Sequence, residues 1–308
     1  MNYLEPDDIW EIFGIKSETD FREMYLLLGK FHSLVPKKII DDYKLVERLL
    51  YYSYFHYPLI DEAFSKSTRI FEASVTLKLE IEGLKKNGFE TLHSKLNRLK
   101  KYCSNDLFEQ WKNAKELRND FAHREAGTFM GIALMNGFKH NLNLINSIFL
   151  EPSTILEKEN NHKELLKQSE HLINGFFVLE HDDNRILVAH ARPFTTGIIK
   201  NLGQSLWVFI PITGEKSIEK TSDLPKAFIL KLENLHINKT GLSAIDSTTK
   251  KPINLTTTDN SENLAKFIQH DSRIKTLEIE SQDISREYMV ILKHKTNKEI
   301  ANFLYEDW

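Results

Sequence analysis

The sequence predicts an α+β protein with a helical N-terminal half and a mainly β or α+β C-terminal half. Apolar residues recur at helical spacing over the first 150 positions, and short β-branched and aromatic runs follow after about residue 175. The stretch between them is polar, and 308 residues suffice for two domains. We therefore expect a helical domain at 1–150, a linker or surface helix at 151–170 and an α+β domain of unknown role at 171–308.

Capping and breaking residues divide the helical half into segments. Asp7 is a suitable N-cap for a first helix, which Gly14 would end. Pro58 stops or kinks one apolar stripe, and Asn87-Gly88 ends the long helix expected after it. The expected helices cover 2–15, 19–32, 36–58, 58–86, 90–102, 106–124 and 128–149.

The C-terminal half changes to short β-like runs. The first two are joined by Asp182-Asp183-Asn184, a turn-forming cluster that predicts a hairpin. Residues 239–262 are rich in Thr, Ser, Asn, Asp and Lys, which predicts a long loop, and short helices are expected at 263–268 and 297–308. The expected strands cover 175–181, 185–191, 206–212, 227–232, 276–281 and 287–293.

Composition restricts the classes of protein and site. Cys103 is the single cysteine, so an internal disulfide and a cysteine-rich zinc site are excluded. The N-terminus lacks a signal-peptide pattern, and no apolar run approaches the roughly 20 residues that span a bilayer. We expect a soluble, cytoplasmic protein. Its net charge of −3 means that any RNA would have to bind a local basic patch.

Residues 114–127 carry side chains suited to RNA cleavage. Arg118 is followed directly by Asn119 and, five positions after the arginine, by His123. An imidazole can act as acid or base near neutral pH, and a guanidinium offers a planar charged fork for two phosphate oxygens. Asn119 could orient the imidazole or bind the phosphate. Such a set can promote attack of the RNA 2′-hydroxyl on the adjacent phosphate without a metal ion.

This motif lies near the end of an all-helical segment and directly before an apolar final helix. It resembles the active-site segment of the HEPN family of helical domains, over roughly residues 40–150. The resemblance implies an endoribonuclease whose catalytic residues are Arg118, Asn119 and His123, with a cleft shared by two protomers. Many HEPN ribonucleases act as toxins or in antiviral defence, so an inhibitory partner or antitoxin is expected on the same ground. Residues 1–35 and the C-terminal half lie outside the resemblance.

The spacing of the motif has a geometric consequence. Residues five apart on an ideal helix point about 140° apart, from 3.6 residues per turn. Arg118 and His123 therefore reach one phosphate only if the helix bends or if two copies of the segment meet. The resemblance favours the second arrangement and hence a homodimer.

A non-catalytic interpretation stays open. The arginine and the histidine could cap carbonyls or pair with Glu116, Asp120 or Glu125. The helical half would then be a dimerisation or binding module, and the C-terminal domain would bind a ligand or partner.

Other features are less specific. Lys95, Arg98 and Lys101 form a basic stripe that could hold RNA together with Arg124, although a solvated amphipathic helix explains the stripe equally well. The aromatic residues between 51 and 57 could stack on bases, but they suit core packing better. No phosphate-binding loop or dinucleotide fingerprint is present, and His181 and His190 lack further ligands at metal spacing. We expect no cofactor and no metal.

Overall fold

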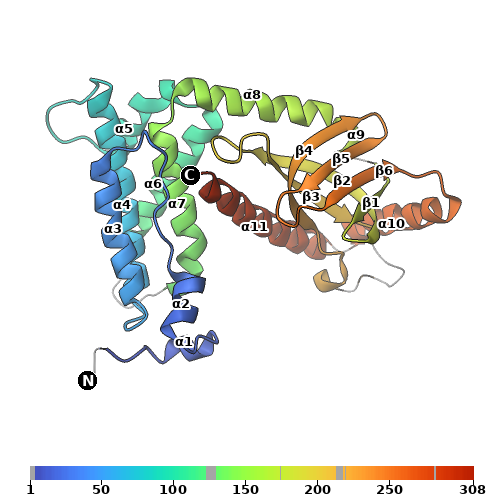
Figure 1. The fold of residues 1–308 in the computed structure, drawn as a ribbon, viewed down its shortest axis with the longest axis horizontal. Helices are drawn as coiled ribbons and strands as arrows, with labels where there is room; N and C mark the ends of the chain where they lie inside the picture. The colour runs from blue at the N-terminus through green and yellow to red at the C-terminus, as the bar shows by residue number, and fades with distance from the viewer. Residues whose placement is uncertain (1–3, 123–129, 174, 213–217, 219, 281) are drawn as a thin grey trace. The chain divides into compact units, whose positions relative to one another are not determined.

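The computed structural model describes residues 4–122, 130–173, 175–212, 218, 220–280 and 282–308. The chain folds into two compact units. Residues 1–156 with Trp308 form the first, the helical unit, and residues 157–307 form the second, the barrel unit. The predicted α+β class is confirmed, because the first unit is built of helices and the second combines strands with helices (Figure 1).

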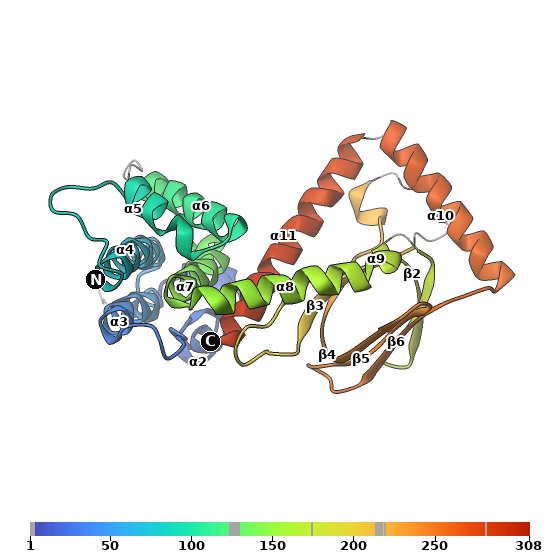
Figure 2. The ribbon, with the colours of Figure 1, turned by 90° about the horizontal axis from the view of Figure 1, so that it is seen from above.

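The long helix α4 is the centre of the helical unit. It contacts α3, α5, α6 and α7, which surround it in Figure 2. Its buried face includes Phe64, Phe71 and Val75, and the Phe64 ring meets Phe138 of α7 edge-on with centroids 5.1 Å apart. The helices are α1 Ile9–Ile12, α2 Glu18–Tyr25, α3 Lys37–Tyr52, α4 Leu59–Ile81, α5 Leu92–Leu99, η1 Lys100–Tyr102, α6 Asn105–Ala122, η2 Gly131–Leu134 and α7 Met135–Phe149.

The helix expected at 19–32 ends early, at Tyr25, and extended chain follows. Side chains take the place of helical hydrogen bonds there. Glu47 accepts from the Gly29 amide at 2.7 Å, and the Asn146 side-chain oxygen accepts from the His32 amide at 3.1 Å. These side chains from other parts of the fold accept the backbone hydrogen bonds, so the segment does not have to continue as a helix.

Most of the segment 151–170 is helical. Helix α8 spans Pro152–Gln168, and the division between the units falls within it, between residues 156 and 157. Of the two forms expected for this segment, the helix is the one that is formed.

Six antiparallel strands close into a barrel in the order of the sequence, with β1 pairing to β6. Side chains on the inward face alternate along the strands, among them Leu179, Trp207 and Leu255. The β1–β2 hairpin is confirmed, and Asp182 and Asp183 both adopt positive φ at its two-residue turn. The elements are α9 Glu170–Ile173, β1 Phe177–His181, β2 Asn184–Thr196, β3 Ser205–Pro211, η3 Thr221–Asp223, β4 Phe228–Asn238, β5 Gly241–Asp246, β6 Pro252–Thr257, α10 Ser261–Glu280 and α11 Gln282–Asp307.

Two predictions for the barrel unit are wrong. The strand expected at 276–281 falls on α10, which is described to Glu280, and the strand expected at 287–293 lies in α11. These two long helices run at an angle to each other in Figure 2. Short apolar runs do not distinguish a strand from a helix, and flanking i,i+4 ion pairs such as Lys275–Asp271 favour the helix. The loop expected at 239–262 contains β5, β6 and the beginning of α10. Its polar composition conceals an alternation of buried residues at 242, 244, 253 and 255.

Within the described ranges, no helix combines the length and apolar composition that a bilayer-spanning segment needs.

Candidate functional site

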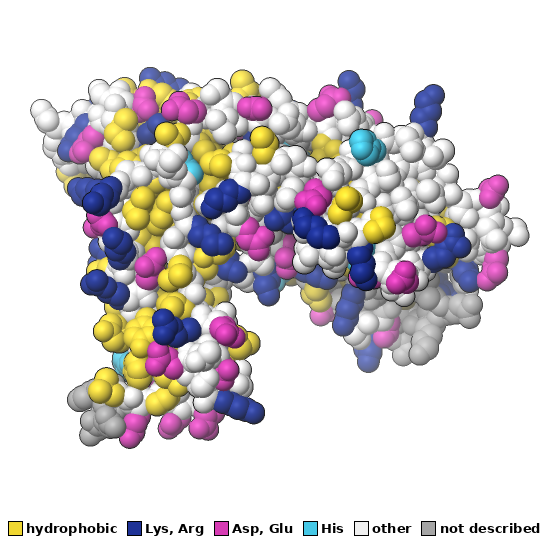
Figure 3. Space-filling view, viewed as in Figure 1, with side chains coloured by type: hydrophobic (Ala, Val, Ile, Leu, Met, Phe, Trp, Pro, Cys, Tyr) yellow, Lys and Arg dark blue, Asp and Glu magenta, His cyan; other side chains and the backbone are white. Residues whose placement is uncertain are grey.

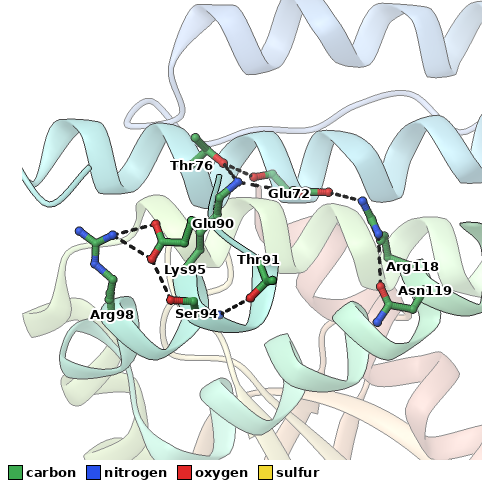
Figure 4. A network of polar contacts seen from close by, with 9 residues as sticks. All are labelled: Glu72, Thr76, Glu90, Thr91, Ser94, Lys95, Arg98, Arg118 and Asn119. Atoms are coloured by element: carbon green, nitrogen blue, oxygen red, sulfur yellow. Dashed lines mark hydrogen bonds and ion pairs between the residues drawn. The ribbon is translucent and has the colours of Figure 1, made fainter. Parts of the chain in front are cut away.

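Arg118 lies near the end of α6 and is held by α4. One terminal nitrogen donates to Glu72 Oε2 at 2.8 Å, and the other donates to Asn119 Oδ1 at 3.3 Å (Figure 4). The Arg118 side chain is 32% exposed and that of Glu72 is 26% exposed. A guanidinium has five N–H donors, so these bonds leave three without a partner in the described part of the chain. Arg118 is therefore positioned and still able to bind oxyanions.

Glu72 also connects Arg118 to the basic stripe on α5. Its Oε1 lies 3.8 Å from Lys95 Nζ, and Lys95 donates a hydrogen bond of 3.1 Å to the Thr76 hydroxyl. Figure 4 shows the carboxylate between the lysine and the arginine. Two cations from α5 and α6 thus share one carboxylate of α4, and this arrangement brings three helices together at one place.

The other members of the basic stripe differ in their surroundings. Arg98 Nη1 donates to both carboxylate oxygens of Glu90, at 2.8 and 3.0 Å. Glu90 also receives a hydrogen bond from Ser94 at 2.9 Å. The hydrogen bond from Arg98, with a smaller effect of the Lys86 charge, lowers the pKa of the Glu90 carboxyl. Lys101 is exposed, and its Nζ lies 4.8 Å from the centroid of the Tyr102 ring.

The opposite face of α5 is apolar, as the amphipathic pattern predicts. Leu92, Leu96 and Leu99 are buried. RNA binding by Lys95, Arg98 and Lys101 stays a prediction, in which phosphates would have to compete with the Glu72 and Glu90 carboxylates.

His123 and Arg124 lie outside the described residues. Helix α6 is described to Ala122, so the distance from Arg118 to the histidine is not given by the structure. The dimeric cleft expected from their spacing therefore stays a prediction as well.

The chain that follows the motif is fixed to the helical unit at residues 130–132. The Asp61 carboxylate accepts hydrogen bonds from the amides of Met130 at 3.0 Å and Gly131 at 2.9 Å. The Tyr57 hydroxyl accepts from the Ile132 amide at 3.0 Å. Gly131 has φ of +52°, and a Cβ at this position would overlap the Tyr57 ring.

The sequence does not predict the contacts that Glu72, Asp61 and Tyr57 make at the candidate site. They lie 46 to 75 positions from their partners, a separation at which no local motif links them. The sequence contains one signal for Glu72. It is an acidic residue that directly follows Phe71, and Phe71 belongs to the apolar stripe of the long helix. The aromatic segment 51–57 contributes mainly to packing, since Tyr54 is buried and Tyr57 lies against Trp10 with centroids 5.2 Å apart.

The histidines of the barrel unit have separate roles. His181 Nε2 lies 3.2 Å from Asp246 Oδ2. Burial alone would raise the pKa of the Asp246 carboxyl, but hydrogen bonds from Thr248, Thr249 and His181 lower it. Burial lowers the pKa of His190. No group of three or more His, Cys, Asp or Glu side chains is arranged to hold a metal ion in the described part of the chain.

Charges of both signs are interspersed over the face of the helical unit seen in Figure 3. The whole molecule has a net charge of −3, so an anion at Arg118 would depend on the cations nearby.

Comparison of the chain with models of protein families, with curated proteins and with solved structures gives no match.

Proposed function

We propose that the protein is a metal-independent endoribonuclease of the HEPN type, with Arg118, Asn119 and His123 as its catalytic residues. The observation that carries the proposal is the placement of Arg118. Glu72 holds the guanidinium beside Asn119 near the end of α6, and His123 follows Arg118 by five positions in the sequence. A fixed, partly exposed arginine can supply the charge that phosphodiester cleavage requires, and a histidine brought to the same phosphate can supply the proton transfer.

The proposed reaction uses the RNA's own nucleophile. A base removes the proton of the 2′-hydroxyl, and the 2′-oxygen forms a bond to the adjacent phosphorus. The bond from phosphorus to the 5′-oxygen breaks, and an acid gives that oxygen a proton. The products are a 2′,3′-cyclic phosphate and a 5′-hydroxyl. His123 suits the acid or base role, and Arg118 stabilises charge on the phosphate as the bonds change.

Glu72 is a positioning residue in this scheme. It contacts no reacting atom, but it fixes the orientation of Arg118 at a distance of 2.8 Å. The homodimer remains part of the proposal, since two segments that meet would supply two histidines, one as acid and one as base. A role as toxin or antiviral effector, with an inhibitory partner, is proposed on the resemblance alone. The barrel unit would then select the target or restrain the nuclease.

One observation favours a second candidate function. The Glu72–Arg118 ion pair also fits a purely structural arginine that joins α4 to α6. The helical unit would then be a non-catalytic binding module.

Variants distinguish the two functions. Purified full-length protein is incubated with single-stranded RNA in the presence of a chelator, beside Arg118→Ala and His123→Ala. Loss of the proton-transfer group in His123→Ala should lower the rate on the order of 10²–10⁴-fold. Loss of the charge that stabilises the transition state in Arg118→Ala should lower it about 10²–10³-fold. Lys112→Ala is the matched control, because Lys112 is also an ion-paired cation on α6, bonded to Glu109 at 2.9 Å. RNA cleavage that is equal in all four proteins, each folded, would contradict the assigned site.

A further inference from the structure

The loop between α4 and α5 presents an aromatic side chain to solvent beside the candidate site. Phe89 is 97% exposed, the highest value among the large hydrophobic side chains of the described residues. It follows Lys85, Lys86 and the Asn87-Gly88 pair in the sequence. A single exposed apolar residue is common on protein surfaces, so the surroundings of Phe89 decide what it means.

A pocket of about 220 Å³ lies at Phe89, between α4, α5 and this loop. Its lining includes Glu72, Thr76, Lys86, Phe89, Glu90 and Lys95. Glu72 and Lys95 belong at once to this pocket and to the group around Arg118. A molecule in the pocket would therefore be separated from Arg118 by a single carboxylate. The volume is below the roughly 300–1,000 Å³ of sites for drug-sized ligands, so it suits one small planar group.

Cations exceed carboxylates at this place. Three lysines, residues 85, 86 and 95, line the pocket with two carboxylates, Glu72 and Glu90. Each of these carboxylates is also bonded to an arginine of α5 or α6. Lys85 is paired with Glu80. The pocket and its rim thus carry positive charge, with an exposed aromatic ring at the edge.

We propose that this pocket is a subsite for one unpaired nucleotide of single-stranded RNA, bound next to the phosphate that Arg118 contacts. Phe89 stacks on the base, and Lys86 and Lys95 bind the flanking phosphates. Proteins that bind single strands combine such a basic groove with aromatic rings, because every base has a face on which a ring can stack. The inference rests on the proposed function and names the form of its substrate.

Single-stranded RNA fits these residues better than other anionic partners. An acidic peptide would use the lysines but has no need of the exposed ring. A membrane surface would use both, but lipid would cover the ring and leave the pocket beside Phe89 unfilled, whereas a nucleotide occupies the pocket. A base stacked on Phe89 with its phosphates on the lysines uses both the ring and the positive charge of the pocket.

The test measures binding apart from cleavage. Full-length protein carrying His123→Ala is titrated into fluorescein-labelled oligoadenosine RNA, and anisotropy gives the Kd. Phe89→Ala should weaken binding about tenfold, the loss of one stacked base, and Phe89→Trp should restore it. Lys86→Ala should weaken binding and reduce the slope of log K against log salt by about 0.7, the value for one phosphate of a single strand. Ile81→Ala is the matched control, an exposed apolar side chain at the end of α4.

The results distinguish failure of the subsite from failure of the proposed function. Equal Kd values for Phe89→Ala and Ile81→Ala, with Arg118-dependent cleavage intact, would overturn the subsite and leave the proposed function standing. An equal loss with duplex RNA would overturn base stacking, because paired bases are not free to stack on the ring. A loss seen only with an acidic peptide or with anionic vesicles would replace RNA by that partner. Failure of the His123→Ala protein to bind RNA, together with failure of the wild-type protein to cleave it, would overturn both proposals together.

Discussion

At the scale of single residues, the candidate site depends on Glu72 as much as on the motif. Its carboxylate contacts Arg118 at 2.8 Å and lies 3.8 Å from Lys95, so it fixes two cations at once. Arg118 and Asn119 can be found in the sequence, because they are adjacent and precede a histidine. Glu72 cannot, because its role is created by the packing of α4 against α6.

The Glu72 carboxylate orients Arg118 and also repels phosphate, and its removal should separate these two effects. Glu72→Ala frees the guanidinium, and we expect kcat to fall about ten- to a hundredfold because the orientation of Arg118 is lost. RNA affinity should rise, since a negative charge beside the phosphate contacts is removed. Glu72→Gln keeps a hydrogen-bond acceptor and should recover part of kcat. Steady-state kinetics that show an unchanged kcat and KM in both variants would argue against a positioning role.

At the scale of elements, the long helices of the first half and four of the six strands expected in the second half are present, and two expected strands fall on helices. The helical spacing at 59–81 and 135–149 is long and strongly periodic, and these are the segments that form α4 and α7. Residues 276–280 and 287–293 are rich in β-forming side chains but belong to helices. Whether such a short run forms a strand or a helix depends on the residues that pack against it in the fold. A local sequence pattern does not contain that information.

The extended segment after α2 gives a prediction about pH. His32 is buried, its Nε2 donates to the Asn146 carbonyl at 2.9 Å, and its Nδ1 accepts from the Leu34 amide at 3.3 Å. These two bonds require the neutral imidazole. Burial lowers the pKa of His32 below its ordinary value of 6.5, although the bond to Asn146 acts in the opposite direction. The folded state therefore binds the proton more weakly than the unfolded state does.

The contribution of neutral His32 to the free energy of unfolding should be complete above about pH 6.5. It should be lost as the pH falls below that value. Urea unfolding of wild type and His32→Gln between pH 5 and 8 measures this as a difference in the free energy of unfolding. The subtraction removes the effect of other buried histidines such as His140, whose pKa is also lowered by burial. A difference that stays constant or grows toward pH 5 would show that His32 is not held neutral.

At the scale of the whole molecule, the two-part composition was visible in the sequence but the barrel was not. The polar segment 239–262 hides β5 and β6, and without them four strands cannot close. Closure itself depends on pairing between β1 and β6, which are separated by more than 70 residues. Pairing over such distances follows from the full set of strands and cannot be deduced from any one of them.

The proposed homodimer also belongs to this scale and predicts a result for mixed subunits. When wild type and His123→Ala are mixed equally and allowed to exchange, wild-type homodimers fall to about a quarter of an isologous dimer population. Activity per total dimer should approach that fraction if both histidines are required. Sites complete within one protomer would give about half. A value near one half after verified exchange, or a monomer that cleaves RNA, would reject the shared cleft.

The chemistry of the product ends tests the central claim most directly. A short RNA is cleaved by the purified protein in excess EDTA, and mass spectrometry identifies the termini, with Arg118→Ala as the control for contaminating nuclease. Attack by the 2′-hydroxyl predicts 2′,3′-cyclic phosphate and 5′-hydroxyl ends, formed in the chelator and lost in the Arg118→Ala sample. Full inhibition by EDTA, or products that end in a 3′-hydroxyl, would contradict metal-independent cleavage at Arg118 and His123.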